Sequence, residues 1–160
     1  YGDHRDLHLS LRRQRQMCIR DRFKAASELR MPYILMHIRG TPKTMLDKTD
    51  YKELIPDIMD YFKKKIDMLY DLDVVDVIID PGFGFAKDYE QNYELLRNLK
   101  LFQIFELPLL AGLSRKSFIK KKYGEDKTLE GTLELNKIAL ENGADIIRVH
   151  DVKENKLLIK

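Results

Sequence analysis

The stretch VVDVIIDPGFGF, residues 74–85, joins an almost uninterrupted apolar run to a turn rich in glycine. Continuous hydrophobicity, without regular alternation of polar and apolar residues, is typical of a strand buried on both faces, as in a parallel sheet. Asp80 ends the run directly before a Pro-Gly turn. Because polar side chains at the carboxyl ends of parallel strands mark the functional site of α/β folds, this turn is the first candidate site.

Three further apolar runs resemble this one, and each is followed by polar residues or glycine: YILMHI at 33–38, LPLLAGL at 107–113 and DIIRVH at 145–150. Apolar residues at helical spacing predict helices between the runs, at 51–70, 89–105 and 128–142. Strand and helix therefore alternate, which predicts an α/β fold of four βα units on a parallel sheet. This pattern alone does not decide between two architectures, a doubly wound open sheet and half of a (β/α)₈ barrel.

The segment RRQRQMCIRDR, residues 12–22, carries five arginines and the only cysteine. Such a run is typical of a basic arm. However, codons that can encode residues 1–22 form a string that resembles a transposase-based sequencing adapter in one frame. We therefore interpret residues 1–22 as a translated adapter, outside the native protein, and exclude them from the fold. Residues 23–160 are expected to be the native part, truncated within a predicted helix at each end.

Charge supports no polyanionic partner for residues 23–160. Six of the 29 Lys and Arg and three of the 26 Asp and Glu belong to residues 1–22, so 23 of each sign remain. The formal net charge of zero argues against a nucleic-acid or membrane partner. Cysteine is absent from this part, which excludes disulfides and Cys-ligated metals, and no apolar run is long enough to span a bilayer. We expect a soluble, cytoplasmic protein.

The second and third strand ends carry candidate ligand groups. The Asp80 carboxylate can accept hydrogen bonds from an amidine-like edge, such as a 2-amino heterocycle, or it can simply stabilise its own turn. Of Phe83 and Phe85, one could cover a bound ring while the other packs into the core. The run Ser114-Arg115-Lys116-Ser117 opens a predicted helix and suits an anion or an electron-rich heteroatom, or else Ser114 is an N-cap among solvated charges.

The fourth strand end carries Arg148 and His150. Their spacing of two predicts that both side chains lie on one face of the strand. A diphosphate would suit the pair, because the arginine fork matches phosphate oxygens, but an ion pair with a neighbouring strand is the alternative. His37, between Met36 and Ile38, is predicted to be a buried structural histidine.

Four segments together resemble the C-terminal half of the dihydropteroate synthase family: LMHIRGTPKTM at 35–45, IIDPGFGFAKD at 78–88, LPLLAGLSRKSFI at 107–119 and ADIIRVHDVKE at 144–154. The resemblance implies that the four βα units are the second half of a (β/α)₈ barrel. It also implies a transferase of folate biosynthesis, a target of sulfonamides, that joins 4-aminobenzoate to a dihydropterin methyl diphosphate and releases diphosphate.

The resemblance assigns substrate contacts residue by residue. Asp80 would hold the amino and ring N–H edge of the pterin, and Met36, Phe85 and Gly112 would line the slot for its ring. Ser117 would lie near the carboxylate of 4-aminobenzoate. Two flexible loops of the family, N-V-T-P-D-S-F and G-E-S-T-R-P-G, do not occur in this sequence. We therefore expect little or no turnover by this chain alone.

The catalytic roles implied by the resemblance fall on Lys116, Arg148 and His150. Lys116 would contact pterin heteroatoms, and Arg148 would pack on the pterin ring and bind the diphosphate together with His150. Magnesium would accompany the diphosphate, with its protein ligand in the family's other half, and the full-length protein would be a homodimer. Two alternatives stay open: a half-barrel that binds a pterin without chemistry, and a pterin-dependent methyltransferase domain.

Overall fold

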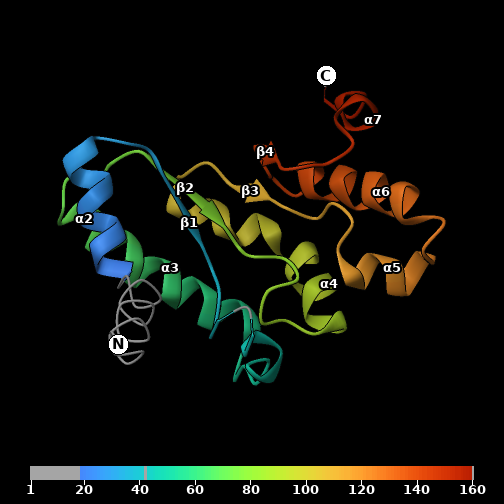
Figure 1. The fold of residues 1–160 in the computed structure, drawn as a ribbon, viewed down its shortest axis with the longest axis horizontal. Helices are drawn as coiled ribbons and strands as arrows, with labels where there is room; N and C mark the ends of the chain where they lie inside the picture. The colour runs from blue at the N-terminus through green and yellow to red at the C-terminus, as the bar shows by residue number, and fades with distance from the viewer. Residues whose placement is uncertain (1–18, 42, 160) are drawn as a thin grey trace, which may run out of the picture.

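Four parallel strands form the centre of the molecule in a computed structural model, which describes residues 19–41 and 43–159 (Figure 1). The strands are β1 (Tyr33–Met36), β2 (Val77–Asp80), β3 (Leu110–Ala111) and β4 (Ile146–Ile147). β1 pairs with β2 and β3 pairs with β4, both in parallel, and a single parallel bridge between Ile79 and Leu109 joins the two pairs. The order of the strands in space therefore follows their order in the chain.

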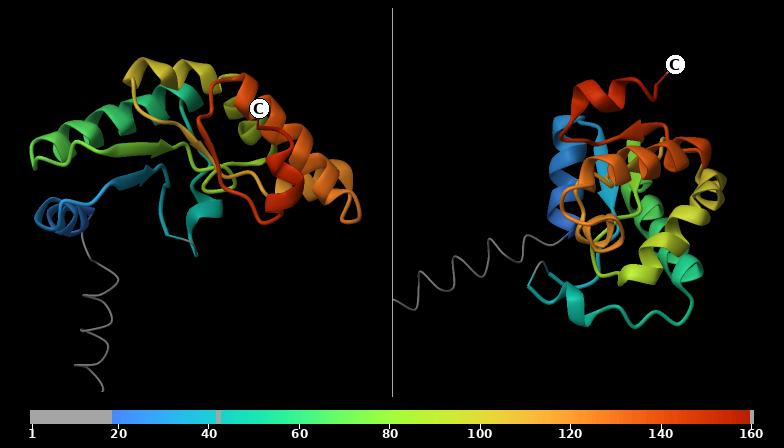
Figure 2. Two further views of the ribbon diagram at one scale, coloured as in Figure 1. Left: turned by 90° about the horizontal axis from the view of Figure 1, so that it is seen from above. Right: turned by 90° about the vertical axis from the view of Figure 1, so that its right-hand side faces the viewer.

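Helices connect each strand to the next, and the long helices between the strands form an arc along one side of the strand layer (Figure 2). The α-helices are α2 (Ile19–Leu29), α3 (Leu54–Tyr70), α4 (Tyr89–Arg97), α5 (Ser117–Tyr123), α6 (Thr128–Glu141) and α7 (Val152–Lys156), and the 3₁₀ segments are η1 (Met45–Asp47) and η2 (Leu99–Phe105). Each strand is followed by at least one helix, which confirms the predicted βα alternation. Among the described residues no helix is long and apolar enough to cross a membrane.

The predicted apolar stripe of α3 is the face that packs against the sheet. Its members are all buried: Leu54, Ile58, Phe62, Ile66 and Leu69. The ring of Phe62 meets Phe102 and Phe105 of η2 edge-on, at centroid distances of 5.9 and 6.0 Å. Edge-to-face pairs add stability beyond the burial of their area, so this aromatic cluster fastens α3 to the η2 segment.

Two expectations about boundaries differ from the structure. The strands are shorter than the apolar runs, and Ile34 of β1 and Ile146 of β4 are 47% and 36% exposed, so burial on both faces fits β2 but not the outer strands. The helix predicted over 89–105 divides into α4 and η2 at Asn98, whose side-chain amide donates to the Glu94 carbonyl at 2.9 Å. Asparagine favours such breaks because its side chain competes for backbone hydrogen bonds.

The predicted adapter segment lies largely outside the described residues. Positions 1–18, with Cys18 and three of the five arginines in the basic run, belong to that part. Residues 19–22 form the first turn of α2, continuous with the helix predicted from Phe23. The interpretation of residues 1–22 as a translated adapter stays a prediction.

Candidate active site

Asp80 is the best-defined group at the strand ends. It is the last residue of β2, in register with Met36 of β1, and only 1% of it is exposed. Its Oδ1 accepts a hydrogen bond from the Gly82 backbone N–H at 2.8 Å, and its Oδ2 accepts one from Arg148 Nη2 at 3.0 Å. Burial raises the pKa of Asp80, while the Gly82 N–H and Arg148 oppose that rise. A carboxylate offers about four lone-pair sites, and these two protein donors occupy two of them.

Arg148 forms the inter-strand ion pair that the sequence left as an alternative to a diphosphate site. Its guanidinium also lies close over Gly112, where a Cβ would come within 2.8 Å of Nη2 and 3.4 Å of Cζ. The arginine follows β4 rather than belonging to it, because the strand ends at Ile147. The prediction that Arg148 and His150 lie on a strand is therefore wrong; in the structure Arg148 contacts Asp80, whereas His150 contacts Ser114.

Lys116 and Phe85 form the second wall of the site. Lys116 Nζ lies 4.1 Å from the centroid of the Phe85 ring, a cation–π contact. Phe83 is buried in the core, as predicted for one of the two rings, and Phe85 is half-buried; that Phe85 covers a bound ring stays a prediction. Burial lowers the pKa of Lys116, and the Asp80 carboxylate opposes that change.

The segment between β3 and α5 binds the residues that follow β4. Ser114 is buried, and its Oγ lies 2.9 Å from His150 Nδ1 and accepts the His150 backbone N–H at 3.2 Å. Arg115 donates from Nε to Asp151 Oδ2 at 3.0 Å. The N-cap of α5 is Lys116, so the alternative that made Ser114 a helix cap is wrong. Ser117, the first residue of α5, is exposed beside these groups.

His37 and Lys87 lie beneath the glycine turn. His37 is buried, as predicted for a structural histidine, and its Nδ1 lies 3.1 Å from Lys87 Nζ. Sequence reasoning missed Lys87, because a lysine after a turn is ordinarily a solvated charge. The only signal available was its place at the end of the segment GFGFAK, five residues beyond Gly82.

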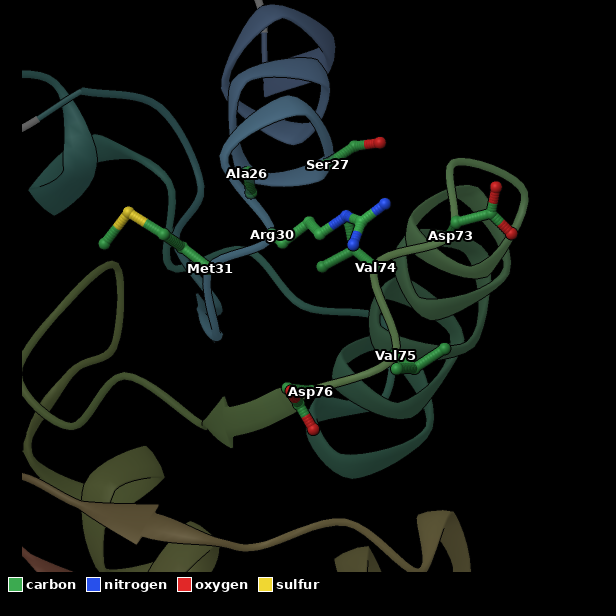
Figure 3. Close-up of a pocket in the computed structure, with 8 residues that line it drawn as sticks. All are labelled: Ala26, Ser27, Arg30, Met31, Asp73, Val74, Val75 and Asp76. Atoms are coloured by element: carbon green, nitrogen blue, oxygen red, sulfur yellow. The ribbon is translucent and has the colours of Figure 1, made fainter.

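Two other kinds of site do not coincide with these strand ends. Within the described residues, no group of three or more His, Cys, Asp or Glu side chains is arranged to hold a metal ion. A cavity of about 540 Å³ lies between α2 and the loop that leads into β2, lined by Arg30, Asp73 and Asp76 among others (Figure 3). It lies at the start of β2, and Asp80 at the end of that strand is not among its lining residues.

Comparison with known proteins identifies the family of this chain. A family model described as pterin binding enzyme matches residues 16–150, so the match begins inside the segment interpreted as an adapter. Dihydropteroate synthase of Escherichia coli is 42% identical over 135 residues, which are 82% of this chain and 48% of that protein. The corresponding enzyme of Synechocystis is 44% identical over 133 residues, 80% of this chain and 46% of that protein.

Solved structures give the same result. A Yersinia pestis dihydropteroate synthase in complex with a sulfonamide drug superimposes with a TM-score of 0.82 at 38% identity, covering 85% of this chain and 51% of that one. The Thermus thermophilus enzyme in complex with 4-aminobenzoate superimposes with a TM-score of 0.81 at 28% identity, covering 84% of this chain and 54% of that one.

The chain spans about half the length of the curated relatives that it matches. The structural match, over about half of each solved chain, confirms that the four βα units correspond to half of a (β/α)₈ barrel. With the family model covering most of the described residues, this chain belongs to the pterin-binding enzyme family.

Proposed function

We propose that this chain is part of a dihydropteroate synthase, a transferase of folate biosynthesis. The reaction joins 4-aminobenzoate to (7,8-dihydropterin-6-yl)methyl diphosphate and yields 7,8-dihydropteroate and diphosphate. The observation that supports it best is the buried Asp80 carboxylate at a strand end, beside the Lys116–Phe85 contact. The 42% identity to dihydropteroate synthase of Escherichia coli supports the choice of this reaction.

Asp80 is the proposed anchor for the pterin. Its free lone pairs would accept the 2-amino group and the neighbouring ring N–H, a planar pair of donors that matches a carboxylate. Phe85 and Met36 would line the slot for the ring. Gly112 would keep that slot flat, because it lacks the Cβ that would displace Arg148.

The proposed chemistry breaks the carbon–oxygen bond to the diphosphate, which leaves with the bonding electrons. The aryl amine of 4-aminobenzoate then attacks the methylene carbon and loses a proton. Arg148 and His150 would stabilise the charge on the leaving group, Lys116 would contact the pterin heteroatoms, and Ser117 would bind the aminobenzoate carboxylate. Catalysis of this kind rests on positioning and electrostatic stabilisation rather than on a protein nucleophile.

Three further elements of the proposal concern the whole protein. Magnesium is proposed as the companion of the diphosphate, but the described residues do not fit a metal cage, so no step is assigned to it here. A cytoplasmic location and a homodimeric assembly are proposed from the family resemblance.

Calorimetric titration with a pterin tests the anchor. Asp80→Asn should weaken binding by about 10- to 150-fold, because a hydrogen bond to a charged group is worth about 1.5–3 kcal/mol. Asp76→Asn, at an exposed carboxylate just before the same strand, is the matched control and should bind as the unchanged chain does. Equal affinity of all three proteins would refute the role of Asp80.

A second candidate function is pterin binding without turnover, favoured by the span of only about half of the relatives' length. One assay tests this second candidate. When both substrates are supplied, we expect the 160-residue chain to bind the pterin but to release little diphosphate. Turnover close to that of an intact synthase would exclude the binding-only candidate.

A further inference from the structure

Lys87 is a buried cation that the proposed chemistry does not use. It is 4% exposed, and its ammonium nitrogen has three partners at the same distance: the Gly82 carbonyl, the Phe85 carbonyl and His37 Nδ1, each at 3.1 Å. Burying an amine is costly unless its hydrogen bonds are made. The three N–H donors of the ammonium group each have an acceptor, which offsets that cost. Lys87 is therefore part of the buried hydrogen-bond network and not a solvated surface charge.

The partners of Lys87 surround the turn that presents the proposed pterin anchor. Gly82 has a φ of +74°, and a Cβ there would lie 2.1 Å from the His37 carbonyl oxygen, so the turn is pressed against the end of β1. The N–H of the same glycine holds Asp80 Oδ1. The Gly82 carbonyl accepts a hydrogen bond from Lys87. Lys87 therefore binds the peptide group after Gly82, while Asp80 binds the peptide group before it.

We propose that Lys87 is a positioning residue that holds the 80–85 turn closed against His37, so that the Asp80 carboxylate and the Phe85 ring keep the geometry that a pterin needs. The inference rests on the proposed function for its ligand, whereas the closing of the turn can be measured without one. Lys87 acts through Gly82 and Phe85, and it lies beneath the turn rather than in the slot.

The hydrogen bonding around Lys87 survives the loss of its proton. Burial lowers its pKa to about 7 and that of His37 to about 3, so the imidazole is neutral where the lysine titrates. As an ammonium, Lys87 donates to both carbonyls and to Nδ1. As an amine, it donates to the carbonyls and accepts from Nδ1–H, if His37 changes tautomer.

The charges that face Lys87 come from several elements. Asp80 at the end of β2 raises its pKa, and Lys116 at the start of α5 lowers it. His37 faces it from the segment at the end of β1, and Arg39, like Lys87, lowers the pKa of His37. Titration of Lys87 therefore changes the charge beside the turn while leaving the turn bonded.

Amide hydrogen exchange of the full chain tests the proposal directly. Lys87→Met keeps the length of the side chain but removes its donors, and Lys63→Met at an exposed position of α3 is the matched control. The Gly82 amide should exchange at least tenfold faster in Lys87→Met and at the original rate in Lys63→Met. If the buried Ile79 amide accelerates by the same factor, Lys87 merely stabilises the fold and the positioning role is overturned.

Two further measurements keep the proposal falsifiable. In the unchanged chain, the Lys87 Cε resonance and the Gly82 amide resonance should titrate with one midpoint near pH 7. A Gly82 resonance that does not shift with this titration would contradict the coupling between Lys87 and the turn. Pterin affinity should fall at least tenfold in Lys87→Met, and retained affinity would overturn the positioning role. A chain that binds no pterin but shows the predicted Gly82 exchange would refute the proposed function while supporting the hold on the turn.

Discussion

Replacing Gly112 with alanine should disconnect Arg148 from Asp80 without disturbing the rest of the fold. Gly112 follows β3 directly, and a Cβ built there lies 2.8, 3.4 and 3.5 Å from Nη2, Cζ and Nε of Arg148. The atom closest to the new methyl group, Nη2, is the one that donates to Asp80 Oδ2. Because the obstructing atoms are the far end of a flexible side chain, Arg148 rather than the backbone should move.

The size of the effect follows from the exposure of the two partners. Asp80 is buried, but the side chain of Arg148 is 52% exposed, so water screens the pair and offers the displaced guanidinium an alternative. Exposed pairs contribute up to about 1 kcal/mol, and hydrogen bonds to buried charges about 1.5–3 kcal/mol. A coupling of about 1 kcal/mol, at the screened end of this range, is the expected value, equal to about a fivefold change in the ratio of folded to unfolded protein.

A double-mutant cycle isolates this coupling. The unchanged chain, Gly112→Ala, Arg148→Ala and the double variant would be unfolded in urea and followed by tyrosine fluorescence, which suits a chain with eight tyrosines and no tryptophan. Gly112→Ala should cost about 1 kcal/mol when Arg148 is present and nothing, or a small gain, when it is absent. Equal destabilisation in both backgrounds would refute the argument, because the methyl group would then clash with something other than Arg148.

Four further results are expected. Phe62→Ala should lower the free energy of unfolding by about 3–5 kcal/mol in urea denaturation, because it empties the centre of a fully buried aromatic cluster. Asp88→Ala should cost about 1 kcal/mol in the same assay, since Asp88 forms a reciprocal capping box with Gln91 at the start of α4. Burial lowers the pKa of Lys87 from 10.5 to about 7, so the unfolded chain binds its proton more tightly and the urea midpoint should rise between these pH values, but not in Lys87→Met. Source DNA sequenced upstream of the Phe23 codon should encode further βα units in place of residues 1–22, and a genomic origin of those residues would contradict the adapter interpretation.

The long-range partners of polar side chains are what the sequence could not predict. The α3 stripe and the buried run of β2 were predictable, because each carries its periodicity in the residues themselves. For Arg148 the sequence left two roles open, a diphosphate ligand or an ion pair with a neighbouring strand. That its partner in the free protein is Asp80 depends on the approach of β2 to the residues after β4. The burial of Lys87 was not predicted at all, because it depends on the 80–85 turn folding back over the side chain.

One carboxylate faces three cations at the strand ends, and this imbalance bears on the choice of ligand. Asp80 raises the pKa of both Lys87 and Lys116, whereas Lys116 lowers the pKa of Lys87 and Arg148 lowers that of Lys116, so the cations repel one another and share a single counter-charge. A region with excess positive charge attracts anions. A neutral pterin would bind Asp80 but leave the excess positive charge in place. A pterin that carries a diphosphate would bind Asp80 and also neutralise that charge. In the proposed reaction, negative charge would grow on the diphosphate as the carbon–oxygen bond breaks, where Arg148 would stabilise it, and positive charge would grow on the pterin, whose far edge Asp80 would hold. Under the proposed function, the same distribution of charge would favour both binding of the diphosphate ester and its cleavage.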